Sequence, residues 1–243
     1  QKEHGLTFVH PFDDLAVAAG QGTLALEILA DEPDLDTLVV AVGGGGLIAG
    51  IATAAKALKP AMRVVGVQTE RFPSMLNAVQ GSHLPMGAST IAEGIAVATA
   101  GQMTQQVVRE LVDELLLVDE GDIEQAVLML LEIEKTLVEG AGAAGLAALI
   151  RHREKFKGQK VGLVLSGGNI DPMLLAAIIE RGMARSGRLA RIRVSARDVP
   201  GVLAKITATV ADLGANIEEV HHQRAFTLLA AQKLRIPVFE YTP

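Results

Sequence analysis

The sequence has no cysteine and no tryptophan among its 243 residues, and aromatic side chains make up only 3% of it. The lack of cysteine excludes disulfide bonds, thiolate nucleophiles and cysteine-ligated metals, and it suits a reducing cytoplasm, which is the expected location. An excess of positive charge is also lacking, since 22 Lys and Arg face 28 Asp and Glu for a formal net charge of −6. A chain of this charge does not attract a polyphosphate backbone, so nucleic acid is not an expected partner.

Long apolar runs are absent too, although 49% of the residues are hydrophobic. Every apolar run is interrupted by glycine or charge well before the ~18 residues that a membrane-spanning helix needs. No signal peptide is recognised at the start, so the chain is expected to have no membrane partner. Because the sequence opens at Gln1 without a methionine, we expect it to be a piece of a longer protein.

The first 185 residues alternate short β-branched runs with stretches rich in alanine and leucine. Strands are expected at 37–42, 63–67, 114–118 and 161–165, and helices at 47–58, 100–112, 122–137, 140–151 and 173–183. This alternation predicts an α/β domain, an open and mostly parallel sheet with helices on both faces, over residues 1–185.

The composition changes after residue 185, where 185–188 (RSGR) is typical of a linker. Residues 189–196 alternate apolar and polar side chains like a strand with one face in water, and further strands are expected at 216–222 and 233–241. A helix is predicted at 202–213 between them. The expected second domain, a small α+β module over 189–243, is too short for a substantial core and should need a partner, either another copy or the large domain.

Four consecutive glycines, Gly43 to Gly46, separate the first predicted strand from its helix. Backbone amides without side chains can surround an anion there, and the helix N-terminus adds about half a positive charge, which suits a phosphate group. A flexible connection is the plainer alternative, but glycine carries an entropy cost of ~0.5–1 kcal/mol per residue relative to alanine. No Gly-Lys-Ser or Gly-Lys-Thr follows, which excludes a nucleotide-hydrolysing loop. The loose dinucleotide pattern G-x-G-x-x-A is satisfied, yet Gln68 follows the next strand where a nicotinamide site needs an acid, so a nicotinamide oxidoreductase is a weaker alternative.

A second glycine turn, SGGN at 166–169, ends another apolar strand. Both turns follow the carboxyl end of a strand, so we expect them at the same edge of the parallel sheet. This edge is where ligands of open α/β sheets bind. By itself the turn could equally be a helix cap, since serine and asparagine cap helices well.

Five segments occur in a characteristic order: VGGGGL at 42–47, VGVQ at 65–68, TIAEGI at 90–95, EGAGA at 139–143 and LSGGN at 165–169. Together with FVHPFDD at 8–14 and AGQGT at 19–23, they resemble the fold type II pyridoxal-phosphate enzymes, most closely the threonine ammonia-lyases (threonine dehydratases). The C-terminal segments RDVPGVL at 197–203 and GANI at 214–217 are similar to the ACT regulatory module, although the module looks truncated.

The resemblance implies a set of site residues. Pyridoxal 5'-phosphate is the implied cofactor, and Ser166 would face its ring nitrogen without protonating it, which makes the ring a weaker electron sink. A regulatory amino acid would contact Asp198, Pro200, Gly201 and Asn216. The implied cofactor-binding residues are Gly43, Gly44, Gly45, Gly46, Leu47, Gly94, Glu139 and Ser166.

The resemblance also implies what this chain lacks. The Schiff-base lysine belongs to an N-terminal segment with no counterpart here, so no catalytic residue is assigned and the chain alone should be inactive. Related racemases hold a divalent metal with acids where this chain has Gln68 and Ser74, so no metal site is expected. Most of the small substrate-binding domain is lacking along with the lysine, so the chain resembles the large-domain half of a longer enzyme together with its regulatory module.

The implied activity is dehydration and deamination of threonine, and of serine, to 2-oxobutanoate or its serine counterpart and ammonia. This is a step typical of isoleucine biosynthesis, in an allosterically regulated homo-oligomer. A serine or aspartate racemase, a hydroxyaspartate dehydratase, and a non-catalytic amino-acid-binding regulator of the same fold remain open alternatives.

Overall fold

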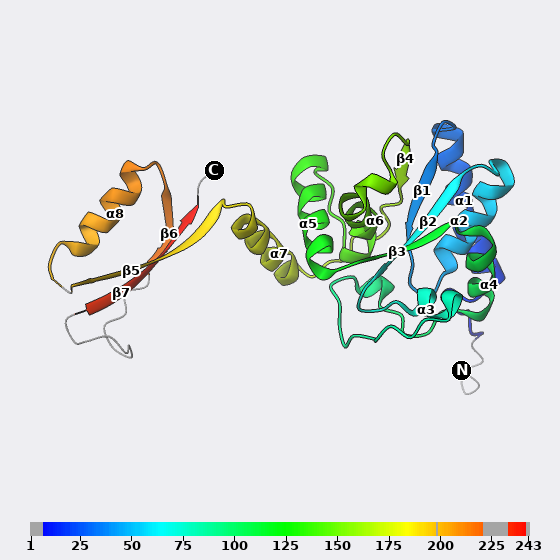
Figure 1. Cartoon of the computed structure of the whole chain (residues 1–243), viewed down its shortest axis with the longest axis horizontal. Helices are drawn as coiled ribbons and strands as arrows, with labels where there is room; N and C mark the ends of the chain where they lie inside the picture. Colours follow the sequence, from blue (N-terminus) through cyan, green and yellow to red (C-terminus); the bar gives the residue numbers. More distant parts are fainter. Residues whose placement is uncertain (1–6, 198, 221–232, 242–243) are drawn as a thin grey trace. The chain divides into compact units, whose positions relative to one another are not determined.

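The computed structural model describes residues 7–197, 199–220 and 233–241, the last of these as backbone only. The chain divides into two compact units, Gln1–Asp171 and Pro172–Pro243, and each is described by itself (Figure 1). Among the helices of the described residues, none is long and apolar enough to cross a membrane.

The first unit is built on a four-stranded parallel sheet with the strand order β3-β2-β1-β4. In the middle of β1, Val39 lies beside Val65 of β2 and Leu163 of β4. The two central strands, β1 and β2, are buried on both faces, as expected for parallel strands covered by helices. The strands are β1 (Thr37–Ala41), β2 (Arg63–Thr69), β3 (Glu114–Val118) and β4 (Val161–Leu163).

Helices cover both faces of this sheet (Figure 1). Helix α2 packs against α1 and α4 on one side, and α5 packs against α6 on the other. The helices are α1 (Leu15–Asp31), α2 (Gly46–Leu58), α3 (Ser74–Gln80), α4 (Gln102–Leu111), α5 (Glu120–Met129) and α6 (Gly140–Arg151).

The expected single helix over 122–137 is wrong. Helix α5 ends at Met129, and a π-helical turn, Leu130–Glu134, follows it. Lys135 then takes a left-handed conformation with φ 56°, and the N–H of Thr136 donates to the carbonyl oxygen of Leu130 at 3.1 Å. This wide turn ends the helix, so the chain reaches Glu139 in an extended conformation.

Helices α1 and α2 cross at two glycines. A methyl group on Gly22 would lie 2.9 Å from the carbonyl oxygen of Gly50, and one on Gly50 would lie 2.6 Å from the amide nitrogen of Gly22 and run into the carbonyl oxygen of Ala18. The backbones therefore touch at this crossing, which fixes the position of α2 and of the glycine loop that precedes it.

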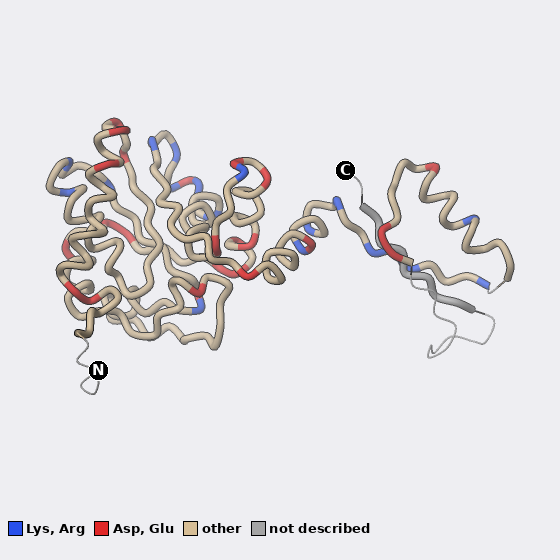
Figure 2. Tube along the Cα trace, turned by 180° about the vertical axis from the view of Figure 1, so that it is seen from behind, with Lys and Arg blue, Asp and Glu red and all other residues tan. Residues whose placement is uncertain are grey.

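Ion pairs join neighbouring elements at the surface of the first unit, where basic and acidic residues are intermingled along the trace (Figure 2). The Arg151 guanidinium reaches Glu70 at 2.8 Å and Asp122 at 2.6 Å, and Lys56 reaches Asp113 at 2.8 Å. Exposed pairs of this kind contribute ~0–1 kcal/mol each, so apolar burial carries most of the stability.

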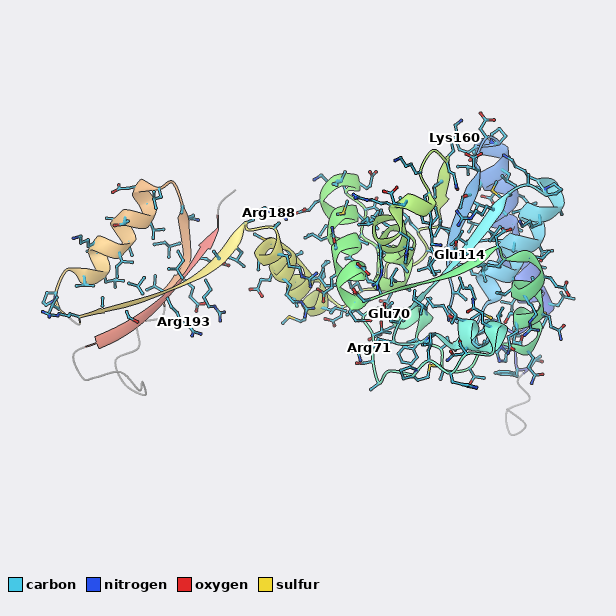
Figure 3. The ribbon with its side chains drawn as sticks, in the orientation of Figure 1. Glu70, Arg71, Glu114, Lys160, Arg188 and Arg193 are labelled. Carbon is cyan, nitrogen blue, oxygen red and sulfur yellow. The ribbon has the colours of Figure 1, made fainter. Side chains whose placement is uncertain are left out.

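Glu114, which is labelled on β3 in Figure 3, forms ion pairs with two basic side chains. Its carboxylate lies 2.7 Å from Arg63 and 2.6 Å from Lys155. Partial burial alone would raise the pKa of Glu114, but the hydrogen bonds and charges of Lys155 and Arg63 outweigh it and hold the pKa below its ordinary value of 4.5. We expect Glu114→Gln to lose roughly 0.5–1 kcal/mol of unfolding free energy at pH 7.

The pH dependence follows from the lowered pKa. The ionised pair stabilises the protein above the pKa of the unfolded chain, and this contribution is lost as the pH falls through the folded pKa. The unfolding free energies of wild type and Glu114→Gln, measured by urea titration, should therefore converge as the pH drops below 4.5, the ordinary pKa of this group. Glu154→Gln is the control, because Glu154 is 74% exposed and its ion-pair contact with Arg153 is 3.5 Å long. If the difference in unfolding free energy between wild type and Glu114→Gln stayed constant with pH, the ion pairs of Glu114 would not be the cause of its lowered pKa.

The second unit contains α7 (Pro172–Arg185) and a three-stranded antiparallel sheet with the order β5-β7-β6. The strands are β5 (Leu189–Arg197), β6 (Asn216–Val220) and β7 (Lys233–Tyr241), and α8 (Val202–Asp212) connects β5 to β6. Strand β6 was expected to extend to 222, but residues 221 and 222 lie outside the described residues. No described side chain of α8, β5 or β6 is buried, so the described part of this unit buries few apolar side chains.

Candidate functional site

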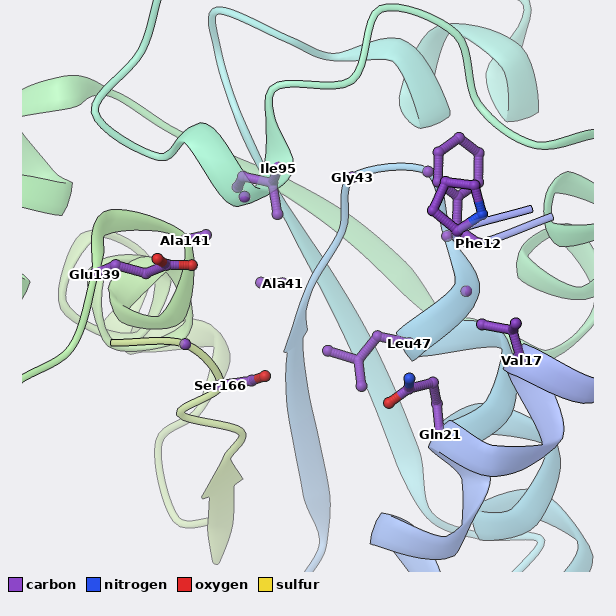
Figure 4. Close-up of a pocket in the computed structure, with 16 residues that line it drawn as sticks. Phe12, Val17, Gln21, Ala41, Gly43, Leu47, Ile95, Glu139, Ala141 and Ser166 are labelled. Atoms are coloured by element: carbon purple, nitrogen blue, oxygen red, sulfur yellow. The ribbon is translucent and has the colours of Figure 1, made fainter. Parts of the chain in front are cut away.

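A pocket of about 280 Å³ opens at the carboxyl ends of β1 and β4 (Figure 4). All eight residues expected to bind the cofactor line it, so the structure brings together segments that lie more than a hundred residues apart in the sequence. The lining residues are Pro11, Phe12, Val17, Gln21, Ala41, Gly43, Gly44, Gly45, Gly46, Leu47, Gly94, Ile95, Glu139, Ala141, Ser166 and Gly167.

The glycine loop between β1 and α2 presents bare backbone to this pocket. Gly44, Gly45 and Gly46 are buried, yet among the described residues no amide from Gly43 to Leu47 donates a hydrogen bond to a protein acceptor. Buried N–H groups in folded proteins are nearly always paired, and the first N–H groups of a helix attract anions. The loop amides are therefore available to hydrogen-bond an anionic ligand.

The loop tolerates only glycine at its centre. Gly45 has φ +101°, and a methyl group on it would lie 2.5 Å from Cε of Met75 and 2.7 Å from Oγ1 of Thr104. A methyl group on Gly44 would run into the ring of Phe12. Met75 and Thr104 fill the space behind Gly45, outside the pocket, and Phe12 covers Gly44 as part of the pocket wall.

Ser166 faces the loop from the opposite wall, on the segment after β4, and its hydroxyl is directed into the pocket (Figure 4). A hydroxyl can donate or accept one hydrogen bond at neutral pH without carrying charge. A heterocyclic nitrogen bonded to it would therefore stay neutral.

Glu139 packs between two glycines at the N-terminus of α6. Its Oε1 would lie 2.9 Å from a methyl group on Gly94 and would collide with one on Gly167. The N–H of Glu139 also donates to the carbonyl oxygen of Gly167 at 3.1 Å. Because neither glycine has a side chain, the Glu139 carboxylate fits between them at the pocket wall (Figure 4).

Glu120, the first residue of α5, holds the segment that carries Gly94. Its Oε1 accepts hydrogen bonds from the hydroxyls of Thr90 at 2.6 Å and Thr69 at 3.2 Å, and its Oε2 accepts from the N–H of Ile91 at 2.8 Å. We expect Glu120→Ala to cost ~2 kcal/mol of unfolding free energy, because three donors lose a charged acceptor. Hydrogen exchange should quicken at residues 91–95.

Glu110→Ala serves as the matched control for this substitution, since Glu110 is an exposed helical glutamate. It should leave both stability and exchange at 91–95 unchanged. If Glu120→Ala left the exchange of this segment as slow as in wild type, other contacts would have to hold Gly94 at the pocket.

The pocket also contains residues that the sequence analysis did not single out. Phe12 comes from the segment FVHPFDD, Gln21 from AGQGT, and both stand near the glycine loop (Figure 4). Both segments contributed to the family resemblance, but nothing in their spacing indicated which side chain would point inward.

Gln68 is fully buried at the end of β2, at the position where an acidic residue would suit a metal. Its Nε2 donates to the carbonyl oxygens of Val42 and Phe72, both at 3.2 Å, and its Oε1 accepts from the N–H of Leu76 at 2.9 Å. Ser74 Oγ is buried and has no hydrogen-bond partner within the described ranges of the chain. Among the described residues no group of three His, Cys, Asp or Glu side chains is arranged to hold a metal ion.

The expected regulatory residues lie in the second unit. Asp198 is outside the described residues, while Pro200 and Gly201 form an exposed turn before α8, with φ +88° at Gly201. Asn216 begins β6 and pairs with Tyr241, which also pairs with Leu189 at the start of β5. The turn instead follows the last residue of β5, Arg197. Within one copy of the chain, Asn216 and this turn are therefore at opposite ends of the sheet.

Comparison with known proteins gives two family matches and several similar proteins. Residues 1–167 match the family described as pyridoxal-phosphate dependent enzyme, and residues 190–228 match the ACT domain. An L-threonine ammonia-lyase of Thermotoga maritima is 45% identical over 227 residues, which is 93% of this chain and 56% of that relative. The chain thus spans little more than half the length of the curated relative.

Solved structures agree with these matches. A threonine deaminase from T.th. is 38% identical with a TM-score of 0.66, covering 70% of this chain and 65% of that chain. A maize serine racemase is 35% identical, also with a TM-score of 0.66, covering 74% of this chain and 58% of that chain. These findings confirm the family resemblance and the α/β fold class predicted from the motifs.

Proposed function

This chain belongs to the family of pyridoxal-phosphate-dependent enzymes, and we propose that it forms the phosphate-binding and ACT-containing part of an enzyme that deaminates L-threonine, and L-serine, to a 2-oxoacid and ammonia. The observation that carries the proposal is that, within the described part of the chain, the amides of Gly43 to Leu47 at the head of α2 donate to no protein acceptor, although Gly44, Gly45 and Gly46 are buried. A phosphate monoester is the anion of suitable size and charge for such a cradle.

The residues of the pocket fit the cofactor. When bound, pyridoxal 5'-phosphate supplies an electron sink for the α-carbon of an amino acid. The amides of Gly43 to Leu47 would bind the phosphate, and Gly94 and Glu139 would bound the ring. Ser166 would bond the ring nitrogen and leave it uncharged, which weakens the sink and favours loss of a β-hydroxyl over transamination.

We further propose that the enzyme is a cytoplasmic homo-oligomer. The exposed apolar side chains of the second unit support a second copy as partner, because Val199, Leu203 and Leu213 are 52%, 38% and 80% exposed. A unit whose described side chains on α8, β5 and β6 are not buried is expected to gain stability by pairing. We also propose two domains, residues 1–185 and 189–243. The second domain would bind a regulatory amino acid near Asp198, Pro200, Gly201 and Asn216.

A binding measurement directly tests the proposed phosphate cradle, which is formed by the amides of Gly43 to Leu47. Pyridoxine 5'-phosphate and pyridoxine share the ring, lack the reactive aldehyde and differ only in the phosphate, so calorimetry with both isolates the phosphate contribution in the chain as it stands. We expect pyridoxine 5'-phosphate to bind at least about 100-fold more tightly, equivalent to ~3 kcal/mol. Equal affinities would overturn the proposal for this loop.

Activity is tested by placing the N-terminal part of the Thermotoga relative in front of this chain. With pyridoxal 5'-phosphate, the chimera should release 2-oxobutanoate from L-threonine. Interconversion of serine enantiomers without ketoacid would indicate a racemase, and amino-acid binding without turnover would indicate a regulator. A chimera carrying Ser166→Ala should keep its fold and lose turnover.

A further inference from the structure

Thr104 lies directly behind the glycine loop and outside the pocket. It is fully buried in the first turn of α4, and its hydroxyl donates to the carbonyl oxygen of Gly44 at 2.6 Å. The N–H of Gly101 donates to the same oxygen at 3.1 Å. Neither Thr104 nor Gly101 lines the pocket, so the Gly44 carbonyl is drawn away from the ligand side.

The direction of this carbonyl determines the direction of the next amide. In a trans peptide the C=O and the N–H lie in one plane and point to opposite sides. A Gly44 carbonyl held against α4 therefore turns the N–H of Gly45 toward the pocket. The reverse orientation would present a carbonyl oxygen to an anion and repel it.

The position of Thr104 is itself fixed from two sides. The Asp13 carboxylate caps α4 and accepts from the N–H groups of Gln102 at 2.8 Å, Met103 at 2.9 Å and Thr104 at 3.3 Å. Methyl groups on Gly45 and Gly101 would lie 2.7 Å and 2.6 Å from the Thr104 hydroxyl oxygen. The hydroxyl is thus enclosed by two glycines and a capped helix end. Two acceptors lie within its reach, the carbonyl oxygens of Gly44 at 2.6 Å and Gly101 at 3.2 Å, and the Gly44 oxygen is the nearer.

We propose that Thr104 is a positioning residue that holds the peptide between Gly44 and Gly45 with its N–H toward the phosphate of the ligand. The inference rests on the proposed function, since it assumes that this loop binds a phosphate monoester. It predicts that a side chain outside the pocket sets part of the affinity for the phosphate and none of the affinity for the ring.

The test compares Thr104→Val, which keeps the shape and removes the hydroxyl, with Thr104→Ser, which keeps the hydroxyl. In the full chain, Thr104→Val should weaken pyridoxine 5'-phosphate binding about tenfold, the effect of one lost hydrogen bond of ~1.4 kcal/mol. Pyridoxine binding should not change, and Thr104→Ser should stay within about threefold of wild type. If wild type prefers the phosphorylated ligand and Thr104→Val keeps the full preference, the inference is overturned while the phosphate cradle stands.

A measurement on the wild-type chain covers the case in which the valine variant does not fold. Titration with pyridoxine 5'-phosphate should shift the amide resonance of Gly45 downfield, whereas pyridoxine should not. An unmoved Gly45 amide, with other loop amides responding, would overturn the role of Thr104 without touching the cradle. If no loop amide responds, the proposed function itself fails.

Discussion

Replacing Gly45 with alanine should lower the affinity for pyridoxine 5'-phosphate about 100-fold. At φ +101° an added methyl group meets Met75 and Thr104. The left-handed conformation costs an alanine ~1–2 kcal/mol, and overpacking adds ~1–3 kcal/mol. The loop can relieve this strain only by moving, which turns its amides away from the pocket. Calorimetry with the phosphorylated ligand gives the size of the effect.

Gly158→Ala is the matched control for backbone strain. Gly158 has φ +75° and nothing within 4 Å of an added methyl group, so it shares the left-handed conformation without the contacts. It should lose ~1–2 kcal/mol of unfolding free energy and keep wild-type affinity. A Gly45→Ala variant that bound the ligand as tightly as wild type would mean that the phosphate is held elsewhere.

Replacing Gly50 with alanine should destabilise the first unit by ~3 kcal/mol or more. The methyl group would run into the carbonyl oxygen of Ala18 and lie 2.6 Å from the amide nitrogen of Gly22. Both are backbone atoms inside α1, so no side chain can rotate away and the two helices must separate. Urea denaturation followed by circular dichroism measures the loss.

Gly20→Ala, on the partner helix α1, separates packing from helix propensity. No atom lies within 4 Å of a methyl group there, and alanine is favoured over glycine in a helix by ~0.5–1 kcal/mol. This variant should therefore be slightly more stable than wild type. If Gly50→Ala were also neutral, the close approach of α1 and α2 would not hold in solution.

The strands were predicted well because buried parallel strands are short runs of β-branched residues between glycine and charge. Prediction failed where tertiary contacts override local pattern: the periodicity of 122–137 continues past the π-helical turn at Leu130–Glu134. Helices α1 and α3 were not predicted at all. Helix α1 is short of the charges that mark a solvent face, and α3 has only 7 residues.

The candidate site, too, was predictable from the sequence only in part. Glycine runs after strands are visible in the sequence, and the eight expected cofactor residues do line one pocket, although their binding role stays a prediction. Thr104 and Glu120 gave no signal. Each acts through hydrogen bonds to a distant segment, and a single threonine or glutamate has no spacing that reveals its partner.

The buried amide at Gln68 limits what this position can accept. Its nitrogen end faces two carbonyl oxygens and its oxygen end faces an N–H, so all three bonds depend on one group that is both donor and acceptor. Glutamate would set a negative charge against two oxygens, and leucine would leave three backbone groups without partners. The neutral carboxamide thus acts as a structural crosslink whose polarity cannot be reversed, and it anchors the end of β1 from which the glycine loop departs.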